Sequence, residues 1–175
     1  MVAEIIFIAA TRGLMVAFNA APMNQQVEKY PLEKVKWLFV NEIEGAALSG
    51  QSELNQITHS LSSRWQDTDI ILTAGKEGCI YTNLKETISM GACNVQTVDT
   101  TGAGDTFIGF FLHSVLDGKN KETVLQIATV ASAIAVTRSG AAASIPHWAE
   151  VEAILPYYLM FTKQRPIFLV ERKQP

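Results

Sequence analysis

The chain has 175 residues, of which 48% are hydrophobic, and its formal net charge is −3. This length and composition suit one soluble domain with a real core, and the mild acidity excludes the basic surface expected of a nucleic-acid-binding protein. The N-terminal apolar run is interrupted by Glu4 and Arg12 and is too short to span a membrane or to resemble a signal peptide. Cys79 and Cys93 lack metal-ligand spacing, so we expect buried thiols in a reducing compartment. Together with the charge and the short apolar run, this predicts a cytoplasmic location and no membrane or nucleic-acid partner.

Short apolar runs alternate with helix-like segments along most of the chain. In chain order we predict a helix over 2–11, strands over 14–18 and 37–40, helices over 42–48 and 52–65, strands over 70–72, 79–82, 87–90 and 95–98, and helices over 107–116, 122–137 and 148–155. The uninterrupted apolar runs are typical of buried parallel strands, and Asn120 is a candidate N-cap. This alternation predicts an α/β protein with a mostly parallel sheet, helices on both faces, and ligands beyond the carboxyl ends of the strands.

The most informative segment is 99–107, which reads DTTGAGDTF and lies between a predicted strand and a predicted helix. The small residues Gly102, Ala103 and Gly104 allow backbone N–H groups at a helix start to point at an anion. Asp105 lies in the same turn and would repel a phosphate, but it suits removal of a proton from an alcohol that attacks that phosphate. The alternative is a glycine-rich helix start in which Asp105 only complements the helix dipole.

The glycine spacing fits neither a dinucleotide fingerprint nor a P-loop. Segment 99–107 instead resembles, nearly residue for residue, the C-terminal signature of the ribokinase-like family of sugar and nucleoside kinases. It departs from that family at Phe110, where a second small residue usually follows Gly109, and we expect crowding there. The resemblance implies a ribokinase-like three-layer sandwich and ATP-dependent phosphorylation of a sugar hydroxyl. Ribose, giving ribose 5-phosphate, is the first candidate substrate, with fructose or a nucleoside as alternatives.

In such a kinase, Asp105 would be the catalytic base, and the amides of Gly102, Ala103 and Gly104 would form the anion hole. A second motif opens the predicted helix over 42–48, where Asn41 and Glu44 face the same side of a turn. Because magnesium prefers oxygen ligands and keeps its waters, the resemblance implies a hydrated Mg²⁺ at Glu44 and nucleotide binding at Asn41. The alternative is ordinary helix capping by an Asn and a first-turn Glu.

The segment TAGKEG between two predicted strands resembles the nucleotide loop of the same family. The residues implied in ATP binding there are Thr73, Ala74, Gly75, Lys76, Glu77 and Gly78. Glycines in such a loop allow close approach of the backbone to a ribose or a phosphate, whereas the alternative is a plain β-turn. The resemblance also assigns Gly104 and Asp105 to the nucleotide site and places Thr129 beside the adenine.

A third match runs over 135–146, after the predicted alanine-rich helix. In ribokinase-like enzymes that bind a monovalent cation, this loop and the Asp-Thr-Thr stretch form the site. The implied K⁺ ligands are Asp99, Thr101, Ala135, Arg138, Gly140 and Ser144. The alternative is a helix C-cap at Gly140 followed by a turn before Pro146.

The resemblance covers about residues 14–155 and corresponds to the C-terminal half of a family member. We find no counterpart of the N-terminal half, with its sugar pocket and β-sheet lid. We therefore expect a catalytic, nucleotide-binding part over 1–156 and an atypical tail over 157–175. A truncated, non-catalytic nucleotide-binding or oligomer-forming remnant is the alternative function. An exposed sheet edge would favour pairing between chains, so a homodimer is one expected assembly.

Overall fold

The computed structural model describes residues 1–161, and the chain divides into two compact units. The first unit comprises Met1–Ala74 with Ile80–Ile88, and the second comprises Gly75–Cys79 with 89–161. Of the predicted tail, 162–175 lie outside the described residues. Among the described residues, no helix is both long and apolar enough to cross a bilayer.

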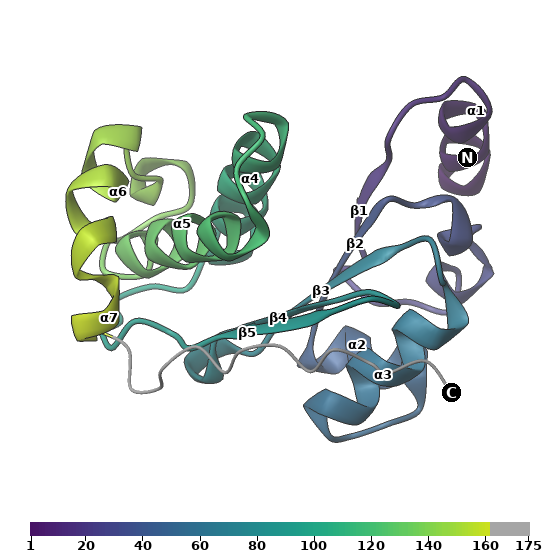
Figure 1. Ribbon diagram of the computed structural model, residues 1–175, viewed down its shortest axis with the longest axis horizontal. Coiled ribbons are helices and arrows are strands. Elements are labelled where there is room, and N and C mark those ends of the chain that lie inside the picture. Colours follow the sequence, from purple (N-terminus) through teal and green to yellow (C-terminus); the bar gives the residue numbers. More distant parts are fainter. Residues whose placement is uncertain (162–175) are drawn as a thin grey trace. The chain divides into compact units, whose positions relative to one another are not determined.

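The strands form a five-stranded sheet in the order β1-β2-β3-β4-β5 (Figure 1). Its strands are β1 (Ala17–Asn19), β2 (Trp37–Asn41), β3 (Asp69–Thr73), β4 (Cys79–Thr82) and β5 (Thr87–Met90). The first three are parallel, with Trp37 of β2 pairing with Ala17 on one side and with Asp69 on the other. The predicted strands over 37–40, 70–72, 79–82 and 87–90 are therefore confirmed.

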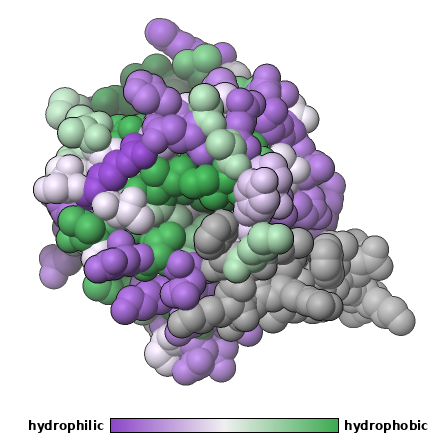
Figure 2. All heavy atoms as spheres, turned by 90° about the vertical axis from the view of Figure 1, so that its left-hand side faces the viewer, coloured by the Kyte–Doolittle hydropathy of each residue, from purple (hydrophilic) through white to green (hydrophobic). Residues whose placement is uncertain are grey.

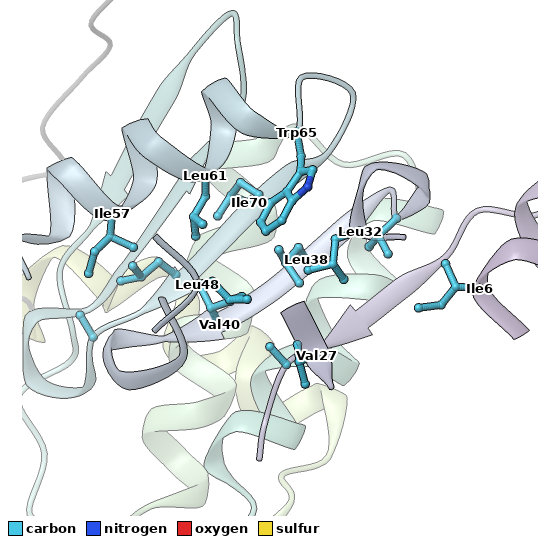
Figure 3. Packing of buried hydrophobic residues seen from close by; sticks show 14 residues of the cluster. Ile6, Val27, Leu32, Leu38, Val40, Leu48, Ile57, Leu61, Trp65 and Ile70 are labelled. Carbon is cyan, nitrogen blue, oxygen red and sulfur yellow. The ribbon is translucent and has the colours of Figure 1, made fainter. Parts of the chain in front are cut away.

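The first unit also contains α1 (Val2–Thr11), α2 (Glu42–Ser49) and α3 (Leu54–Arg64), as predicted. Helices α2 and α3 lie against the same face of β2 and β3 (Figure 1). Figure 3 shows the buried cluster between them, to which β2 contributes Leu38 and Val40 and α3 contributes Ile57 and Leu61. Alternate strand residues thus point toward the helices, because side chains in a strand alternate between its faces.

The first predicted strand differs most from expectation. Strand β1 has only three residues, and its burial pattern is that of a mostly exposed strand. Leu14 and Met15, which we expected inside it, precede it and are 62% and 63% exposed. Within the described residues β1 pairs with β2 alone and lies at the end of the strand order. Because both faces of a buried parallel strand are covered, and most of this segment is exposed, the prediction of a buried strand over 14–18 is wrong.

The helices of the second unit are α4 (Ala103–Leu116), α5 (Lys121–Ala135), α6 (Trp148–Ile154) and α7 (Tyr158–Phe161). The predicted cap of α5 is confirmed, since Thr123 N donates to Asn120 Oδ1 at 2.8 Å. Helix α5 packs along α4, and its buried residues include the small Ala128 and Ala131. Figure 2 views the side on which α5, α6 and α7 lie and shows hydrophobic side chains among hydrophilic ones. Met160 of α7 is 79% exposed.

The predicted strand over 95–98 does not form. Val98 N and Asp99 N both donate to the carbonyl oxygen of Val136, at 2.7 and 3.2 Å. The amides at the end of this segment are therefore bonded to the loop after α5 rather than to a neighbouring strand. Helix α4 also begins at Ala103, four residues before the predicted start at Phe107, so Asp105 lies inside its first turn.

Candidate functional site

The turn before α4 is held by bonds from its own helix and from α5. Gly102 is the N-cap and has a positive φ of 75°, which favours glycine. Its carbonyl oxygen accepts hydrogen bonds from Thr106 N and Thr106 Oγ1, both at 2.9 Å. Ser132 Oγ of α5 donates to the carbonyl oxygen of Ala103 at 3.1 Å. Hydrogen bonds from the hydroxyls of Thr106 and Ser132 thus hold the start of α4 in place.

Two of the three predicted anion-binding amides are available to a ligand. Among the described residues, the N–H groups of Gly102 and Gly104 donate no hydrogen bond, whereas Ala103 N donates to Thr100 O at 3.2 Å. The side chain of Asp105 has no ion pair or hydrogen bond there, and the residue is exposed. The turn therefore presents free amides and a carboxylate to solvent, which suits both the catalytic role and the simpler role as a dipole partner.

Phe110 does not crowd the first turns of α4 as expected. Its ring stacks on that of Trp148 of α6, with centroids 5.7 Å apart and planes inclined by 4°. A Cβ at Gly109 would meet no atom within 4 Å, so that position has room. His113 meets the same indole edge-on at 4.9 Å. The larger side chain thus serves to pack α6 against α4.

Asp99 joins the two loops of the predicted K⁺ site. Its Oδ1 accepts a hydrogen bond from Thr101 N at 2.9 Å, and its Oδ2 accepts one from Gly140 N at 3.0 Å. The bonds from Thr101, and then the one from Gly140, lower the pKa of Asp99 below its ordinary value. One ionised carboxylate therefore connects the loop before α4 with the loop after α5.

The other predicted K⁺ ligands differ in how far they are already engaged. The carbonyl oxygen of Ala135 accepts a bond from Arg138 N at 3.0 Å, and the buried hydroxyl of Ser144 donates to Ala141 O at 2.7 Å. Within the described residues the carbonyl oxygens of Thr101, Arg138 and Gly140 accept no hydrogen bond. Backbone carbonyls with one carboxylate suit K⁺, since carbonyl oxygens can replace its hydration shell. Residues 1–161 contain no cluster of His, Cys, Asp or Glu suited to a metal ion.

Glu150 of α6 contacts this site and was not singled out in the sequence. Its Oε1 forms an ion pair with Arg138 Nη2, and its Oε2 accepts from His147 N at 2.8 Å. The hydrogen bond from Arg138, followed by that from His147, lowers the pKa of Glu150. A Glu three residues after the helix cap was the only signal available, and it does not reveal the partner twelve residues away.

The glycines of the nucleotide-loop segment have different constraints. Residues Gly75–Glu77 form a short 3-10 helix, so the segment is a turn. Gly75 has a φ of 47° with open space around it, whereas Gly78 has a φ of 99°. A Cβ at Gly78 would lie 1.9 Å from the carbonyl oxygen of Met90. Lys76 and Glu77 are exposed, while Thr73 and Ala74 belong to the first unit.

Thr129 lies at the end of the nucleotide-loop segment. It is 7% exposed, and its Oγ1 is 3.6 Å from Sγ of Cys79, the first residue of β4. Both residues belong to the second unit, so the structure places the residue that we assigned to adenine against the residue that follows Gly78. Burial raises the pKa of Cys79 to about 12, and the predicted buried thiol is confirmed at this position.

Asn41 and Glu44 form a complete capping box at the start of α2. Asn41 Oδ1 accepts bonds from Ile43 N and Glu44 N at 2.8 and 3.0 Å, and Glu44 Oε2 accepts from Asn41 N at 2.7 Å. Helix capping, the alternative that the sequence left open, thus describes this geometry. Oε1 of Glu44 has no hydrogen bond among the described residues, so one oxygen suits a water-mediated contact with Mg²⁺.

Comparison with known proteins supports the resemblance seen in the sequence. Residues 1–148 match the pfkB family of carbohydrate kinases. The chain is 35% identical over 156 residues to a ribokinase of Schizosaccharomyces pombe, covering 83% of this chain and 48% of that protein. It is 31% identical over 132 residues to a fructokinase of Solanum tuberosum, covering 70% and 41%. The chain thus spans about half the length of the curated relatives it matches.

Solved structures agree with these relatives. A ribokinase of Arabidopsis thaliana, solved with ribose and ATP, matches with a TM-score of 0.79 at 25% identity, covering 87% of this chain and 51% of that one. This similarity confirms the predicted α/β fold class, a ribokinase-like three-layer sandwich. The chain belongs to the pfkB family of carbohydrate kinases.

Proposed function

We propose that this chain takes part in ATP-dependent transfer of a phosphoryl group to a sugar hydroxyl. One observation carries the proposal. The exposed Asp105 follows the amides of Gly102 and Gly104, which donate to no described residue, at the start of α4. In a chain of the carbohydrate kinase family, this combination of free amides and a free acid suits phosphoryl transfer to an alcohol better than simple phosphate binding.

The chemistry assigned to these residues is a single displacement. The carboxylate of Asp105 accepts the hydroxyl proton while the sugar oxygen bonds to the γ-phosphorus, and the bond from that phosphorus to the β–γ bridging oxygen breaks to release ADP. A positioned base of this kind contributes about 10²–10⁴-fold. The amides of Gly102 and Gly104 stabilise charge on the phosphoryl oxygens, assisted by the dipole of α4. Ala103 N joins them if it leaves Thr100 O.

Two cations fit residues described above. Glu44 and Asn41 would hold a hydrated Mg²⁺, and Asp99 with the carbonyl oxygens of Thr101, Arg138 and Gly140 would hold K⁺. When bound, these ions would neutralise phosphate charge and stiffen the loop before α4, respectively. The free Oε1 of Glu44 and the three free carbonyl oxygens support the assignments.

ATP is the proposed phosphoryl donor, bound by the segment Thr73 to Gly78 and by Thr129. The contact between Thr129 and Cys79 supports this grouping. Ribose is the first candidate acceptor because ribokinases are among the most similar relatives, and a plant fructokinase of comparable identity makes fructose the second. A nucleoside is the third candidate acceptor. We also propose a cytoplasmic location and a homodimer.

The second candidate function is a non-catalytic nucleotide-binding or oligomer-forming chain. The capping box favours it, because the side chains of Asn41 and Glu44 are already engaged at the start of α2. Calorimetric titration with ATP and Mg²⁺, followed by a coupled assay for ADP with ribose, fructose or adenosine, separates the two. Sugar-dependent ADP formation supports the kinase. Binding of ATP without turnover of any sugar supports a non-catalytic nucleotide-binding chain. Absence of ATP binding contradicts both the kinase and the nucleotide-binding chain, and leaves only the oligomer-forming alternative.

A further inference from the structure

Two loops of the second unit are connected by hydrogen bonds that converge on Asp99 and Val136. The carbonyl oxygen of Val136 accepts bonds from both Val98 N and Asp99 N. The carboxylate of Asp99 bridges Gly140 N, at 3.0 Å, and Thr101 N, at 2.9 Å. Any shift of loop 136–140 is therefore transmitted to residue 101, which directly precedes the first amide of the proposed anion hole.

The same loop is attached to α6 through Arg138. Its guanidinium contacts both carboxylate oxygens of Glu150, as an ion pair from Nη2 to Oε1 and as a longer bond of 3.5 Å from Nη1 to Oε2. Oε2 of Glu150 also accepts the N–H of His147. The carboxylate is thus oriented by the start of its own helix, and its orientation in turn fixes the side chain of Arg138.

We propose that Glu150 is a positioning residue for phosphoryl transfer. Through Arg138 and Asp99 it holds loop 98–102, and with it the amides of Gly102 and Gly104, in the geometry that accepts a phosphate. The same connection sets the affinity of the two loops for K⁺. The effects on phosphate binding and on K⁺ affinity rest on the proposed function. The connection between the two loops rests only on the hydrogen bonds and the ion pair described above.

A purely stabilising role is the competing explanation. The side chains of Arg138 and Glu150 are 36% and 38% exposed, and exposed ion pairs contribute little to global stability. A guanidinium that meets both oxygens of a carboxylate nevertheless restricts geometry. We therefore expect loss of this pair to change the local opening of the loops more than the melting temperature of the chain.

Glu150→Gln is the informative variant, because its amide oxygen can still accept the N–H of His147 while the ion pair is lost. Glu152→Gln is the matched control, since Glu152 is exposed on the same helix and has no partner among the described residues. In hydrogen–deuterium exchange, Glu150→Gln should speed exchange over 98–104 and 136–140 about two- to five-fold, the range that an exposed pair supports. The control should match the unmodified chain.

A double-variant cycle tests the route through Arg138. Arg138→Gln should speed exchange over 98–104 to the same degree as Glu150→Gln, and combining the two should add nothing further, because the pair is already broken. Unchanged exchange over 98–104 in Glu150→Gln, or faster exchange confined to 147–151, would overturn the proposal. Additive effects of the two substitutions would overturn the route through Arg138.

Thermal shifts in KCl and NaCl of equal ionic strength separate this inference from the proposed K⁺ site. We expect K⁺ to raise the melting temperature of the unmodified chain more than Na⁺ does, with a half-saturating K⁺ concentration about two- to five-fold higher in Glu150→Gln. If the two salts act alike while Glu150→Gln still speeds exchange over 98–104, the K⁺ assignment is wrong and the positioning role of Glu150 stands.

Discussion

Gly78→Ala should be among the most damaging single substitutions in the nucleotide-loop segment. The new Cβ would lie 1.9 Å from the carbonyl oxygen of Met90 and 2.7 Å from Ala92 N, and the φ of 99° is unfavourable for alanine. A left-handed conformation costs about 1–2 kcal/mol, and forcing extra atoms into packed structure costs about 1–3 kcal/mol more. We therefore expect a loss of about 2–5 kcal/mol, or roughly 4–20 °C in melting temperature.

Gly75→Ala is the matched control, three residues earlier in the same turn. Its φ of 47° is also positive, but no atom lies within 4 Å of the added Cβ. Only the conformational cost of about 1–2 kcal/mol applies, so the expected loss is about half as large or smaller. Urea unfolding followed by tryptophan fluorescence, together with melting curves, measures both. Equal losses in the two variants would refute the argument that contact with Met90 constrains Gly78.

Two further predictions concern buried polar groups. Ser114→Ala should stabilise the chain by about 1 kcal/mol in urea unfolding, because the Ser114 hydroxyl is buried without a hydrogen bond among the described residues; a destabilised variant would show that the hydroxyl has a partner. The free energy of unfolding should fall more steeply above pH 9 in the unmodified chain than in Cys79→Ala. Burial raises the pKa of Cys79 from 9.0 to about 12, so between these values the thiol ionises only in the unfolded chain. Identical pH profiles for the two chains would contradict this account of Cys79.

Strands β2 and β3 and helices α2 and α3 could be predicted closely because local signals agree there. Runs of apolar residues bounded by polar ones predicted the two strands. Gly50 predicted the end of α2, and in the structure it is the C-cap with a φ of 69°. Helix spacing of apolar residues placed α3 within two residues of its observed bounds. In these segments propensity and tertiary packing favour the same structure.

The two strand errors share a physical cause. An apolar or β-branched run indicates extended backbone, but a strand also needs a neighbour that accepts its hydrogen bonds. The amides of Val98 and Asp99 instead donate to the carbonyl oxygen of Val136, a residue far along the chain. The run over 14–18 precedes or overlaps a strand with one neighbour, so most of it is exposed. The sequence pattern of a segment does not reveal which other segment will accept its hydrogen bonds.

The candidate site shows the same division. The resemblance of segment 99–107 identified Asp105 and the glycine turn, because that information lies within nine consecutive residues. The pattern of Asn41 and Glu44 was ambiguous, and the structure shows that both side chains cap α2. The bond from Gly140 to Asp99 joins residues 41 positions apart, and the pair of Arg138 and Glu150 joins residues 12 apart. Such contacts depend on the fold and have no local signal.

Ribose-dependent formation of ADP by the unmodified chain and by Asp105→Asn, measured together with calorimetric ATP binding, tests the central claim most directly. We predict that the unmodified chain turns over and that Asp105→Asn binds ATP about as well and keeps its melting temperature, because Asp105 has no partner among the described residues. Turnover by the variant should fall by at least about 10²–10⁴-fold, the contribution of a positioned base. Near-normal turnover by a folded, ATP-binding Asp105→Asn variant would contradict the assignment of Asp105 as the base.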